Sequence, residues 1–229
     1  MMNALISFAA LVSYLFFLVR FAWQGLQVLR ASGYAAFFPV FLRRVPASVY
    51  ISTILDILFF RRIFSSSKVL WMGSWIFHIS LFFVTLRHMR YFFPSLPACL
   101  IFLQPVGLAA GYLLPLSLFY LMVLRTVQKK DRYTSSYNYI ISGMLLLISS
   151  TGVAMRAFFR PDVLSVKQFS LGILSLGPRM LPDSSLFLLH FFLFLLLLPY
   201  LPTHIIAAPF VNLEANRRIK ELRYVIHER

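Results

Sequence analysis

The apolar residues of this chain fall in long uninterrupted runs, without the strict alternation of a half-buried strand. Five runs of about 20 residues or more contain few charged side chains. They lie at residues 4–29, 69–93, 105–124, 137–159 and 185–208. Because a helix needs about 20 residues to cross a hydrocarbon core, each run predicts a membrane-spanning helix, and continuous apolarity argues against a β-barrel. We predict an all-α integral membrane bundle of five transmembrane helices, forming a single domain over residues 1–229.

The remaining segments carry patterns of their own. Residues 46–64 (PASVYISTILDILFFRRIF) predict a helix at the membrane surface or against a partner, the alternative being a loop that is hydrophobic by chance. Residues 160–183 hold three prolines and two glycines, which favours an irregular lid on the outer face. Residues 211–229 are polar and predict a helical cytoplasmic tail that either docks a cytoplasmic subunit or is solvated. No basic residue precedes Arg20, so we expect the first run to be a retained helix and not a secretory signal.

Basic residues outnumber acidic ones by 22 to 7 and are distributed unevenly between the loops. Of these, 15 fall on one side of the predicted membrane and 6 on the other. Since cytoplasmic loops are enriched in Lys and Arg, the N-terminus is predicted outside and the C-terminus in the cytoplasm. This bias and attraction to anionic membrane lipid account for the net charge of +15, so we predict no nucleic-acid partner. The single Cys99 excludes an intramolecular disulfide, and an iron–sulfur cluster would need a partner subunit.

Four of the five histidines fall in two of the predicted spans. His78 and His88 lie in the second span, and His190 and His204 lie in the fifth. An ionisable side chain within the membrane is costly unless it is paired or ligated, so these histidines are candidates for a site. With the N-terminus outside, the two spans run in opposite directions. Antiparallel packing would therefore match His88 with His190 near the outer face and His78 with His204 near the cytoplasmic face.

This matching is typical of two stacked b-type haems, each ligated by one imidazole from either helix. We predict that His88 and His190 ligate an outer haem, and that His78 and His204 ligate an inner haem. The ten residues from His78 to His88 correspond to about 15 Å of helix, which suits electron transfer between haems. The fourteen residues from His190 to His204 correspond to about 21 Å, and two prolines between them predict a bend that shortens this rise.

Other uses of the four histidines remain open at the level of sequence. Interhelical hydrogen bonds are the structural alternative. A zinc site is disfavoured because the spans offer no Cys, Asp or Glu beside the histidines. A haem-free membrane anchor that docks soluble subunits is an alternative function. A proton-coupled transporter with a histidine relay is another, although no inverted repeat is detectable.

The residues around the histidines resemble a known family. The similar positions are Trp71, Gly73, Ser74, Phe77, His78, His88, His204, Ile205, Ala208 and Pro209. They resemble the haem-ligating segments of the respiratory nitrate reductase gamma subunit, a five-span dihaem cytochrome b with an outside N-terminus. Its family includes the cytochrome b subunits of sulfate-reducer and heterodisulfide-reductase-like complexes. Arg87, where nitrate reductases have a small residue, and the shorter separation of the last two histidines favour the heterodisulfide-reductase-like branch.

The resemblance implies a function in the respiratory chain of a prokaryotic cytoplasmic membrane. Quinol would be oxidised near the outer haem, and electrons would pass through the inner haem to a cytoplasmic iron–sulfur subunit. Further subunits would complete the complex. The chain alone is then an electron-transfer subunit of a quinol-oxidising oxidoreductase, and none of its residues is predicted to be catalytic.

Arginines predicted near the outer face extend the candidate site. Arg87 and Arg156 are predicted to bind haem propionates or to line a quinone pocket, because a guanidinium pairs well with carboxylates. Arg90 and Arg179 are further members of this group. The alternative for each is an ordinary interfacial arginine. Gly152, one helical turn before Arg156, is predicted to let a haem ring approach closely.

Two aspartates on the same side are candidates to accept protons from quinol. They are Asp162 and Asp183. Asp183 also follows a proline and precedes the fifth span, so it is predicted to cap that helix.

Overall fold

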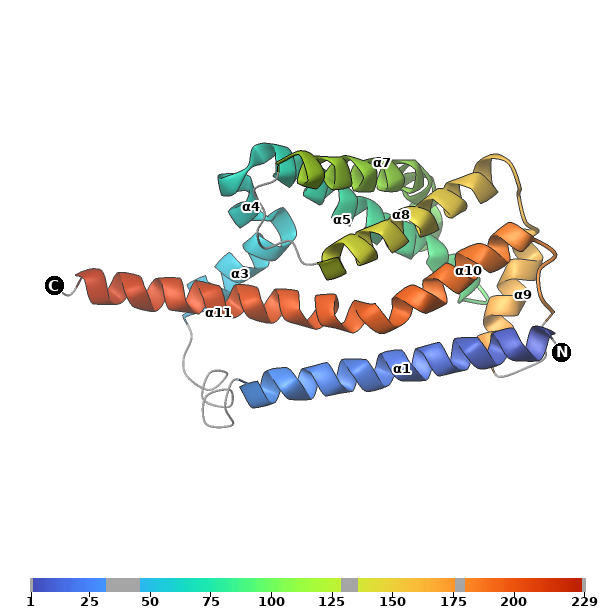
Figure 1. Ribbon diagram of the computed structural model, residues 1–229, viewed down its shortest axis with the longest axis horizontal. Coiled ribbons are helices and arrows are strands. Elements are labelled where there is room, and N and C mark those ends of the chain that lie inside the picture. Colours follow the sequence, from blue (N-terminus) through green and yellow to red (C-terminus); the bar gives the residue numbers. More distant parts are fainter. Residues whose placement is uncertain (1, 32–45, 129–135, 176–179, 228–229) are drawn as a thin grey trace. The chain divides into compact units, whose positions relative to one another are not determined.

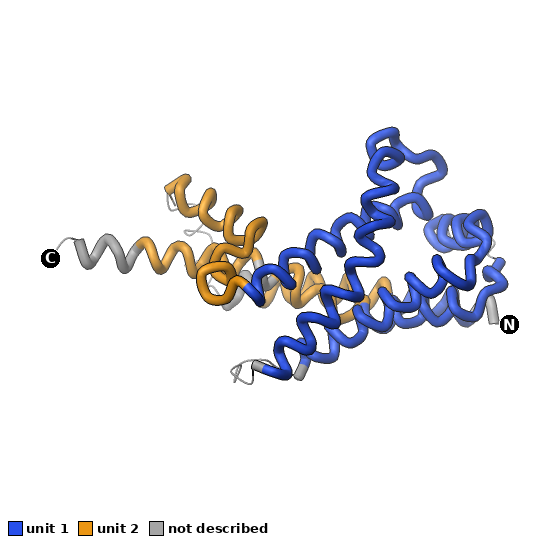
Figure 2. The backbone as a smooth tube through the Cα atoms, turned by 90° about the horizontal axis from the view of Figure 1, so that it is seen from above, with its two compact units in different colours: residues 1–13, 69–197 blue, residues 14–68, 198–229 orange. Residues whose placement is uncertain are grey.

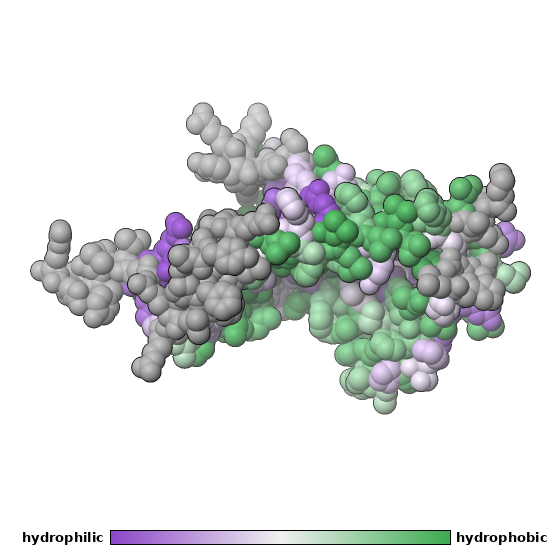
Figure 3. Space-filling model, turned by 90° about the horizontal axis from the view of Figure 1, so that it is seen from below, coloured by the Kyte–Doolittle hydropathy of each residue, from purple (hydrophilic) through white to green (hydrophobic). Residues whose placement is uncertain are grey.

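The computed structural model describes residues 2–31, 46–128, 136–175 and 180–227, and the regular elements of these residues are all helices (Figure 1). Five helical stretches are long and apolar enough to cross a membrane, which confirms the predicted fold class. They are provided by α1 (Met2–Ala31), α5 (Lys68–His88), α7 (Gln104–Gln128), α8 (Ser136–Ala157), and the succession α10 (Ser185–Leu197), η2 (Leu198–Tyr200) and α11 (Leu201–His227). Hydrophobic residues dominate much of the coloured surface in Figure 3, as lipid-solvated helices require. The chain is an integral membrane protein.

The described structure divides into two compact units (Figure 2). The first comprises Met1–Ser13 and Val69–Leu197, and the second comprises Tyr14–Lys68 and Leu198–Arg229. α1 contributes to both units. In the first unit, α8 packs against both α7 and α10, and the short elements η1 (Met89–Tyr91) and α6 (Ala98–Phe102) connect α5 to α7.

Small residues set the close approach of α5 to α7. A β-carbon at Gly73 would lie only 2.7 Å from the ring of Tyr120, and one at Gly107 would lie 2.8 Å from Cβ of Arg87. The Tyr120 hydroxyl donates a hydrogen bond to the carbonyl oxygen of Val69 at 3.3 Å. Helices in membranes associate through such close van der Waals contact, because lipid offers no hydrophobic force between them. These contacts hold the histidine-bearing α5 against its neighbour.

The segment predicted as an irregular lid contains a helix, α9 (Val163–Leu174), so that prediction was wrong for these residues. The carboxylate of Asp162 caps the helix by accepting hydrogen bonds from the backbone N–H of Leu164 at 3.2 Å and of Ser165 at 2.9 Å. An aspartate at this position satisfies backbone donors that the first turn leaves unpaired. The Asp162 cap stabilises a helix at residues 163–174 despite the nearby prolines and glycines.

Aromatic side chains join α9 to α10. Phe169 is 1% exposed, and its ring meets those of Phe187 and Phe191 edge to face, with centroids 5.9 Å and 5.4 Å away. The backbone N–H of Phe187 donates to Oγ of Ser184 at 3.3 Å. The cap of α10 is therefore Ser184, one residue after the predicted Asp183. This packing fixes the start of the helix that carries His190.

In the second unit, the segment predicted to be helical over residues 46–64 forms two helices, α3 (Ala47–Phe59) and α4 (Arg61–Ser66). Between them lies Phe60, whose φ of 49° and ψ of 40° fall in the left-handed region. A bulky side chain rarely adopts this conformation, and the helix changes direction there. α3 packs against α11.

The α-helix of the fifth span is interrupted between His190 and His204, where the sequence predicted a bend. α10 ends at Leu197, η2 contains Pro199, and α11 begins at Leu201. Proline lacks a backbone N–H, so it interrupts the hydrogen-bond ladder of a straight helix. α11 then continues to residue 227, which confirms that the tail is helical over its described part.

Candidate functional site

His88 and His190, predicted to form one pair, lie together in the first unit. His88 is the last residue of α5, and His190 lies in the first half of α10. The two imidazole ring centroids are 6.4 Å apart, and the ring planes are nearly parallel, with an angle of 11° between them. The fold thus brings together two side chains that are 102 positions apart in the sequence.

Hydrogen bonds define the tautomer of both imidazoles. Nδ1 of His88 lies 2.7 Å from the carbonyl oxygen of Val84, and since a carbonyl only accepts, Nδ1 carries the proton. Nδ1 of His190 lies 3.0 Å from Oγ1 of Thr151, and the same Oγ1 lies 3.0 Å and 2.8 Å from the carbonyl oxygens of Leu147 and Ile148. Since these carbonyls can only accept, we assign the hydroxyl proton to one of them and Nδ1 of His190 as the donor to Oγ1. Each ring is held through Nδ1 with Nε2 deprotonated, the form in which an imidazole ligates a metal.

Gly152 of α8 lies beside the His190 ring. A β-carbon built at Gly152 would lie 3.4 Å from Cε1 and 3.8 Å from Nδ1 of His190, so this glycine leaves room for the imidazole. The predicted role of Gly152 was to admit a haem ring, and the structure places it at the histidine that would ligate one. Thr151 was not predicted from the sequence. A threonine in an apolar helix commonly bonds a carbonyl of its own helix, as Thr151 also does, so the sequence carried no signal for its contact with His190.

The separation of the two rings matches coordination of a single metal ion. A bond from metal to imidazole nitrogen is about 2.0 to 2.1 Å, and a ring nitrogen lies about 1.1 Å from the ring centroid. Two imidazoles on opposite sides of one ion would therefore have centroids about 6.3 Å apart. The described residues contain no group of three or more His, Cys, Asp or Glu side chains that could hold a bare ion. A haem needs only two axial side chains, because its macrocycle supplies the other four nitrogens, so His88 and His190 fit this group.

The second predicted pair takes one residue from each unit. His78 lies in the first unit, and its Nδ1 donates to the carbonyl oxygen of Ser74 at 2.7 Å, the same type of bond that orients His88. The Phe77 ring stands at 68° to this imidazole, with centroids 4.6 Å apart. His204 lies on α11 in the second unit, and its side chain is exposed. The pairing of His78 with His204 stays a prediction.

Three arginines accompany the pair of His88 and His190. Nη1 of Arg87 donates to the carbonyl oxygen of Gln104 at 2.6 Å, which ties α5 to the start of α7. Arg87 also interacts electrostatically with Arg90 and Arg156. The ion pairs formed among the described residues leave these three guanidinium groups without a carboxylate partner. Such a cluster attracts an anionic group.

The guanidinium group of Arg90 is only partly satisfied. Its Nη2 donates to the hydroxyl of Tyr91 at 2.5 Å, and its Cζ lies 4.6 Å from the centroid of that ring. Its Nε is buried and has no hydrogen-bond partner in the part of the chain that the structure describes. A buried donor of this kind is costly unless a ligand satisfies it. The fourth predicted arginine, Arg179, lies outside the described residues.

Asp162 is poorly suited to accept quinol protons. The side-chain hydroxyl of Ser165 and the backbone N–H groups of Ser165 and Leu164 donate to its carboxylate, and they hold its pKa below the ordinary value. A carboxylate that is stabilised in its charged form is a weak base. Its role in the structure is to cap α9.

Comparison with known proteins agrees with the resemblance seen in the sequence. The chain is 25% identical over 177 residues to the Hdr-like menaquinol oxidoreductase cytochrome b-like subunit of Archaeoglobus fulgidus, a match that covers 65% of this chain and 53% of that protein. It is 26% identical over 152 residues to the subunit of the same name from Archaeoglobus profundus, with 59% and 45% covered. The chain thus spans about half the length of the curated relatives it matches.

No family model matches the chain, and no solved structure matches it. The resemblance therefore rests on these two relatives and on the histidine-bearing segments. The chain is an integral membrane protein similar to the cytochrome b-like subunits of Hdr-like menaquinol oxidoreductases, the branch that its histidine segments had indicated.

Proposed function

We propose that the chain is a dihaem cytochrome b subunit that carries electrons between membrane quinol and a cytoplasmic iron–sulfur subunit of a respiratory complex. The observation that carries this proposal is the placement of His88 and His190, with ring centroids 6.4 Å apart and nearly parallel planes. Both relatives are named cytochrome b-like subunits of a menaquinol oxidoreductase, which supports menaquinol or a similar quinol as the reductant.

His88 and His190 would hold one haem through their Nε2 atoms. A bound b-type haem with two imidazole ligands supplies a one-electron carrier whose axial positions are both filled, which discourages oxygen chemistry. Val84 and Thr151 fix the two imidazoles by accepting their Nδ1 protons. Because both rings are oriented before a ligand binds, little rearrangement is needed to accommodate the group. Gly152 keeps the space beside His190 open.

The three arginines would complete this site. In the topology with an outside N-terminus, Arg87, Arg90 and Arg156 lie near the outer face with His88 and His190. Their positive charges would hold haem propionates and orient the oxygens of a bound quinol. Quinol oxidation releases two electrons and two protons, and protons released at this face would leave on the outer side. Electrons that then cross inward couple the reaction to the membrane potential.

His78 and His204 would hold the second haem nearer the cytoplasm. The α-helix between the two histidines of the fifth span is interrupted at η2, and a bend there would bring their rise closer to that between His78 and His88. Electrons would leave from this haem to an iron–sulfur subunit in the cytoplasm, since the single Cys99 of this chain is insufficient for a cluster. The chain would then act as one subunit of an oxidoreductase in a prokaryotic cytoplasmic membrane.

The test is a reduced-minus-oxidised optical spectrum with haem quantification on the purified protein. Two b-type haems per chain are expected, with one lost in His190→Ala and the other lost in His78→Ala. His227→Ala, which removes a histidine of the polar tail, is the matched control and should retain both. Folded protein without haem would contradict the proposal and leave a membrane anchor or a transporter. One haem in the unaltered chain, lost only in His190→Ala, would restrict the proposal to the pair that the first unit assembles.

A further inference from the structure

Helix α3 buries Thr53 and Asp56 on the face that packs inside the protein and exposes a row of apolar side chains on the opposite face. Val49 and Thr53 are buried, at 3% and 7% exposed, and the side chain of Asp56 is 10% exposed. On the opposite face, Tyr50, Ile51, Ile54 and Leu58 are 36%, 57%, 54% and 59% exposed. These four residues, called here the α3 stripe, recur at helical spacing along one side of the helix.

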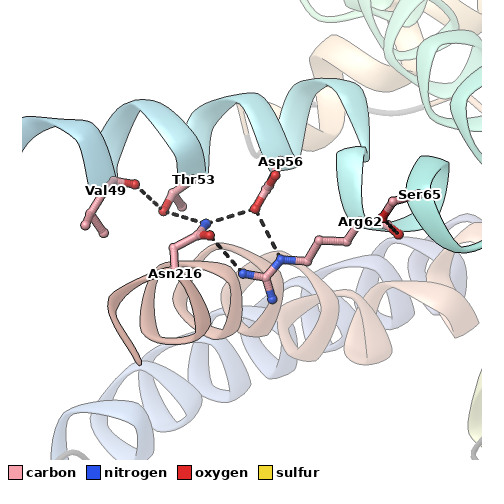
Figure 4. Close-up of polar contacts among 6 residues, drawn as sticks. All are labelled: Val49, Thr53, Asp56, Arg62, Ser65 and Asn216. Carbon is pink, nitrogen blue, oxygen red and sulfur yellow. Dashed lines mark hydrogen bonds and ion pairs between the residues drawn. The ribbon is translucent and has the colours of Figure 1, made fainter. Parts of the chain in front are cut away.

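Four side chains bind the polar face of α3 to α11, and Figure 4 shows Thr53, Asp56 and Arg62 converging on Asn216. Nδ2 of Asn216 donates to Oγ1 of Thr53 at 3.2 Å and to Oδ2 of Asp56 at 2.9 Å. Arg62 donates through Nε to Oδ2 of Asp56 at 3.2 Å and through Nη2 to Oδ1 of Asn216 at 3.0 Å. These four residues form a closed network, called here the clasp. Since the clasp joins the side of α3 that carries Thr53 and Asp56 to α11, it fixes which face of α3 points outward.

An inverted arrangement of this kind suits a helix solvated by lipid. In water the exposed stripe would cost free energy, whereas acyl chains are as apolar as the stripe itself. With 13 residues, α3 is about 20 Å long, too short to cross a hydrocarbon core of roughly 30 Å. Apolar helices of this length lie in the interface or inside proteins. Because the α3 stripe is exposed, the protein interior is excluded and the membrane interface remains as its location.

The position of α3 along the chain places it at the membrane boundary. Only Ser67 separates α4 from Lys68, where the membrane-spanning stretch of α5 begins. α4 has six residues, so it extends about 9 Å. The C-terminal end of α3 is therefore held within about a helix diameter of the level at which α5 enters the membrane.

Exposed basic side chains lie near both ends of α3. Arg61 and Lys68 are exposed, and the exposed Lys220 of α11 donates to the hydroxyl of Ser48 at the start of α3. Lysine and arginine side chains near a membrane surface are attracted to anionic lipid. The combination of an apolar stripe and flanking cations favours lipid over the apolar surface of another protein.

We propose that α3 lies along the membrane leaflet at which α5 begins, with the α3 stripe among the acyl chains and Arg61 and Lys68 at anionic lipid phosphates. The clasp holds the helix in this orientation. The proposal is independent of haem binding, because it concerns a surface of the second unit that carries none of the residues proposed to hold the haem of His88 and His190.

The test measures the environment of the stripe with a nitroxide spin label. Cys99 is the only cysteine, so Cys99→Ser gives a background in which Ile54→Cys carries a single label. The labelled full chain is placed in vesicles of phosphatidylcholine with phosphatidylglycerol, and collision with oxygen is compared with collision with a water-soluble nickel chelate. Phe119→Cys, 61% exposed on α7, is the lipid reference, and Arg218→Cys, with a side chain 71% exposed, is the water reference.

The label at position 54 is expected to follow the lipid reference, with high oxygen and low nickel accessibility. Accessibility to nickel equal to that of the water reference would overturn the proposal. Low accessibility to both reagents would also overturn it, because protein would then cover the stripe. Omitting phosphatidylglycerol should shift the label toward water if Arg61 and Lys68 bind anionic lipid, and an unchanged value would remove that part of the proposal.

Discussion

Two clusters of polar side chains, the clasp and the site of His88 and His190, differ in how many of their polar atoms are hydrogen-bonded within the cluster. In the clasp of the second unit, Asn216 and Asp56 use their polar atoms on one another, on Thr53 and on Arg62. In the first unit, His88 and His190 face each other at 6.4 Å with no hydrogen bond between them, each held from behind through Nδ1. The hydrogen bonds of the first network join its own members, whereas the second holds two neighbouring imidazoles whose Nε2 atoms make no hydrogen bond among the described residues.

This difference separates a structural polar group from a binding one. Polar side chains in a membrane protein are costly wherever they occur, so their presence alone says little about function. The polar residues of a closed network are explained by a structural role, because their hydrogen bonds hold two helices together. An oriented pair of imidazoles, beside three arginines that have no carboxylate partner among the described residues, is incomplete until another molecule binds.

Gly152→Leu should have the largest effect on the incomplete site. A β-carbon at this position already reaches 3.4 Å from His190, so a branched side chain would displace the imidazole. We expect loss of one haem, the one assigned to His88 and His190, measured by haem quantification on the purified variant. Gly143→Leu is the matched control on the same helix, because a β-carbon there has no neighbour within 4 Å. Full haem content in Gly152→Leu would contradict the proposed role of the space beside His190.

Asn216→Leu tests the closed network. It removes the donor and acceptor that join α3, α4 and α11, and it leaves Asp56 partly buried with fewer partners. We expect a loss of about 2 kcal/mol in the free energy of unfolding, which lowers Tm by roughly 4 to 8 °C. The measurement is thermal unfolding in detergent. Arg218→Leu, which breaks an exposed ion pair with Glu214, should change Tm much less.

The haem content of the Asn216→Leu variant also distinguishes the clasp from the histidine site. Asn216→Leu should retain the haem of His88 and His190, because the clasp contributes no residue to that site. Loss of this haem together with the fall in Tm would show that the two polar regions are coupled.

Thr151→Val should have a smaller effect on the incomplete site. Valine keeps the shape of threonine but no longer accepts the Nδ1 proton of His190. Loss of an orienting hydrogen bond typically weakens a metal site by about tenfold or more, so haem should be retained but dissociate more readily. The measurement is haem remaining after repeated detergent washing. Thr85→Val on α5, where the hydroxyl only donates to the carbonyl of Leu81, is the control and should behave like the unaltered chain.

The smallest effect concerns the cap of α9 and its dependence on pH. Ser165 and Leu164 hold the pKa of Asp162 below the unfolded value of about 4, so the stabilisation is present above that value and is lost as pH falls through the folded pKa. Hydrogen exchange of α9 amides should therefore quicken in acid relative to α8. Asp162→Asn retains a weaker cap without a titrating group, so its exchange should lack this difference. An identical pH response in the variant would assign the effect to another group.

The spans and the first histidine pair were predictable because they depend on long-range regularities of the sequence. Run length decides whether a helix crosses a bilayer, and the direction of successive spans decides which histidines can meet. His88 and His190 followed from this reasoning. Thr151 did not, because its role depends on the rotation of α8, which apolar runs leave undetermined.

Local structure was harder to predict wherever one contact outweighed composition. The glycines and prolines around α9 suggested an irregular lid, but the carboxylate of Asp162 stabilises a helix there. Phe60 is an ordinary helix residue by sequence, yet it adopts a left-handed conformation that turns Arg62 back toward Asp56. The clasp includes a residue of α11, so its geometry was absent from any pattern within residues 46–64.

The clasp also has a consequence for biosynthesis. Asn216 follows Asp56 by 160 residues, so a ribosome that adds about 5 to 20 residues per second needs roughly 8 to 32 s to make one after the other. During that interval α3 can place its apolar side in lipid, but its aspartate has no amide to bind. Until α11 is made, Arg62 is the only member of the clasp that Asp56 can bind, so the orientation of α3 is fixed only late in synthesis.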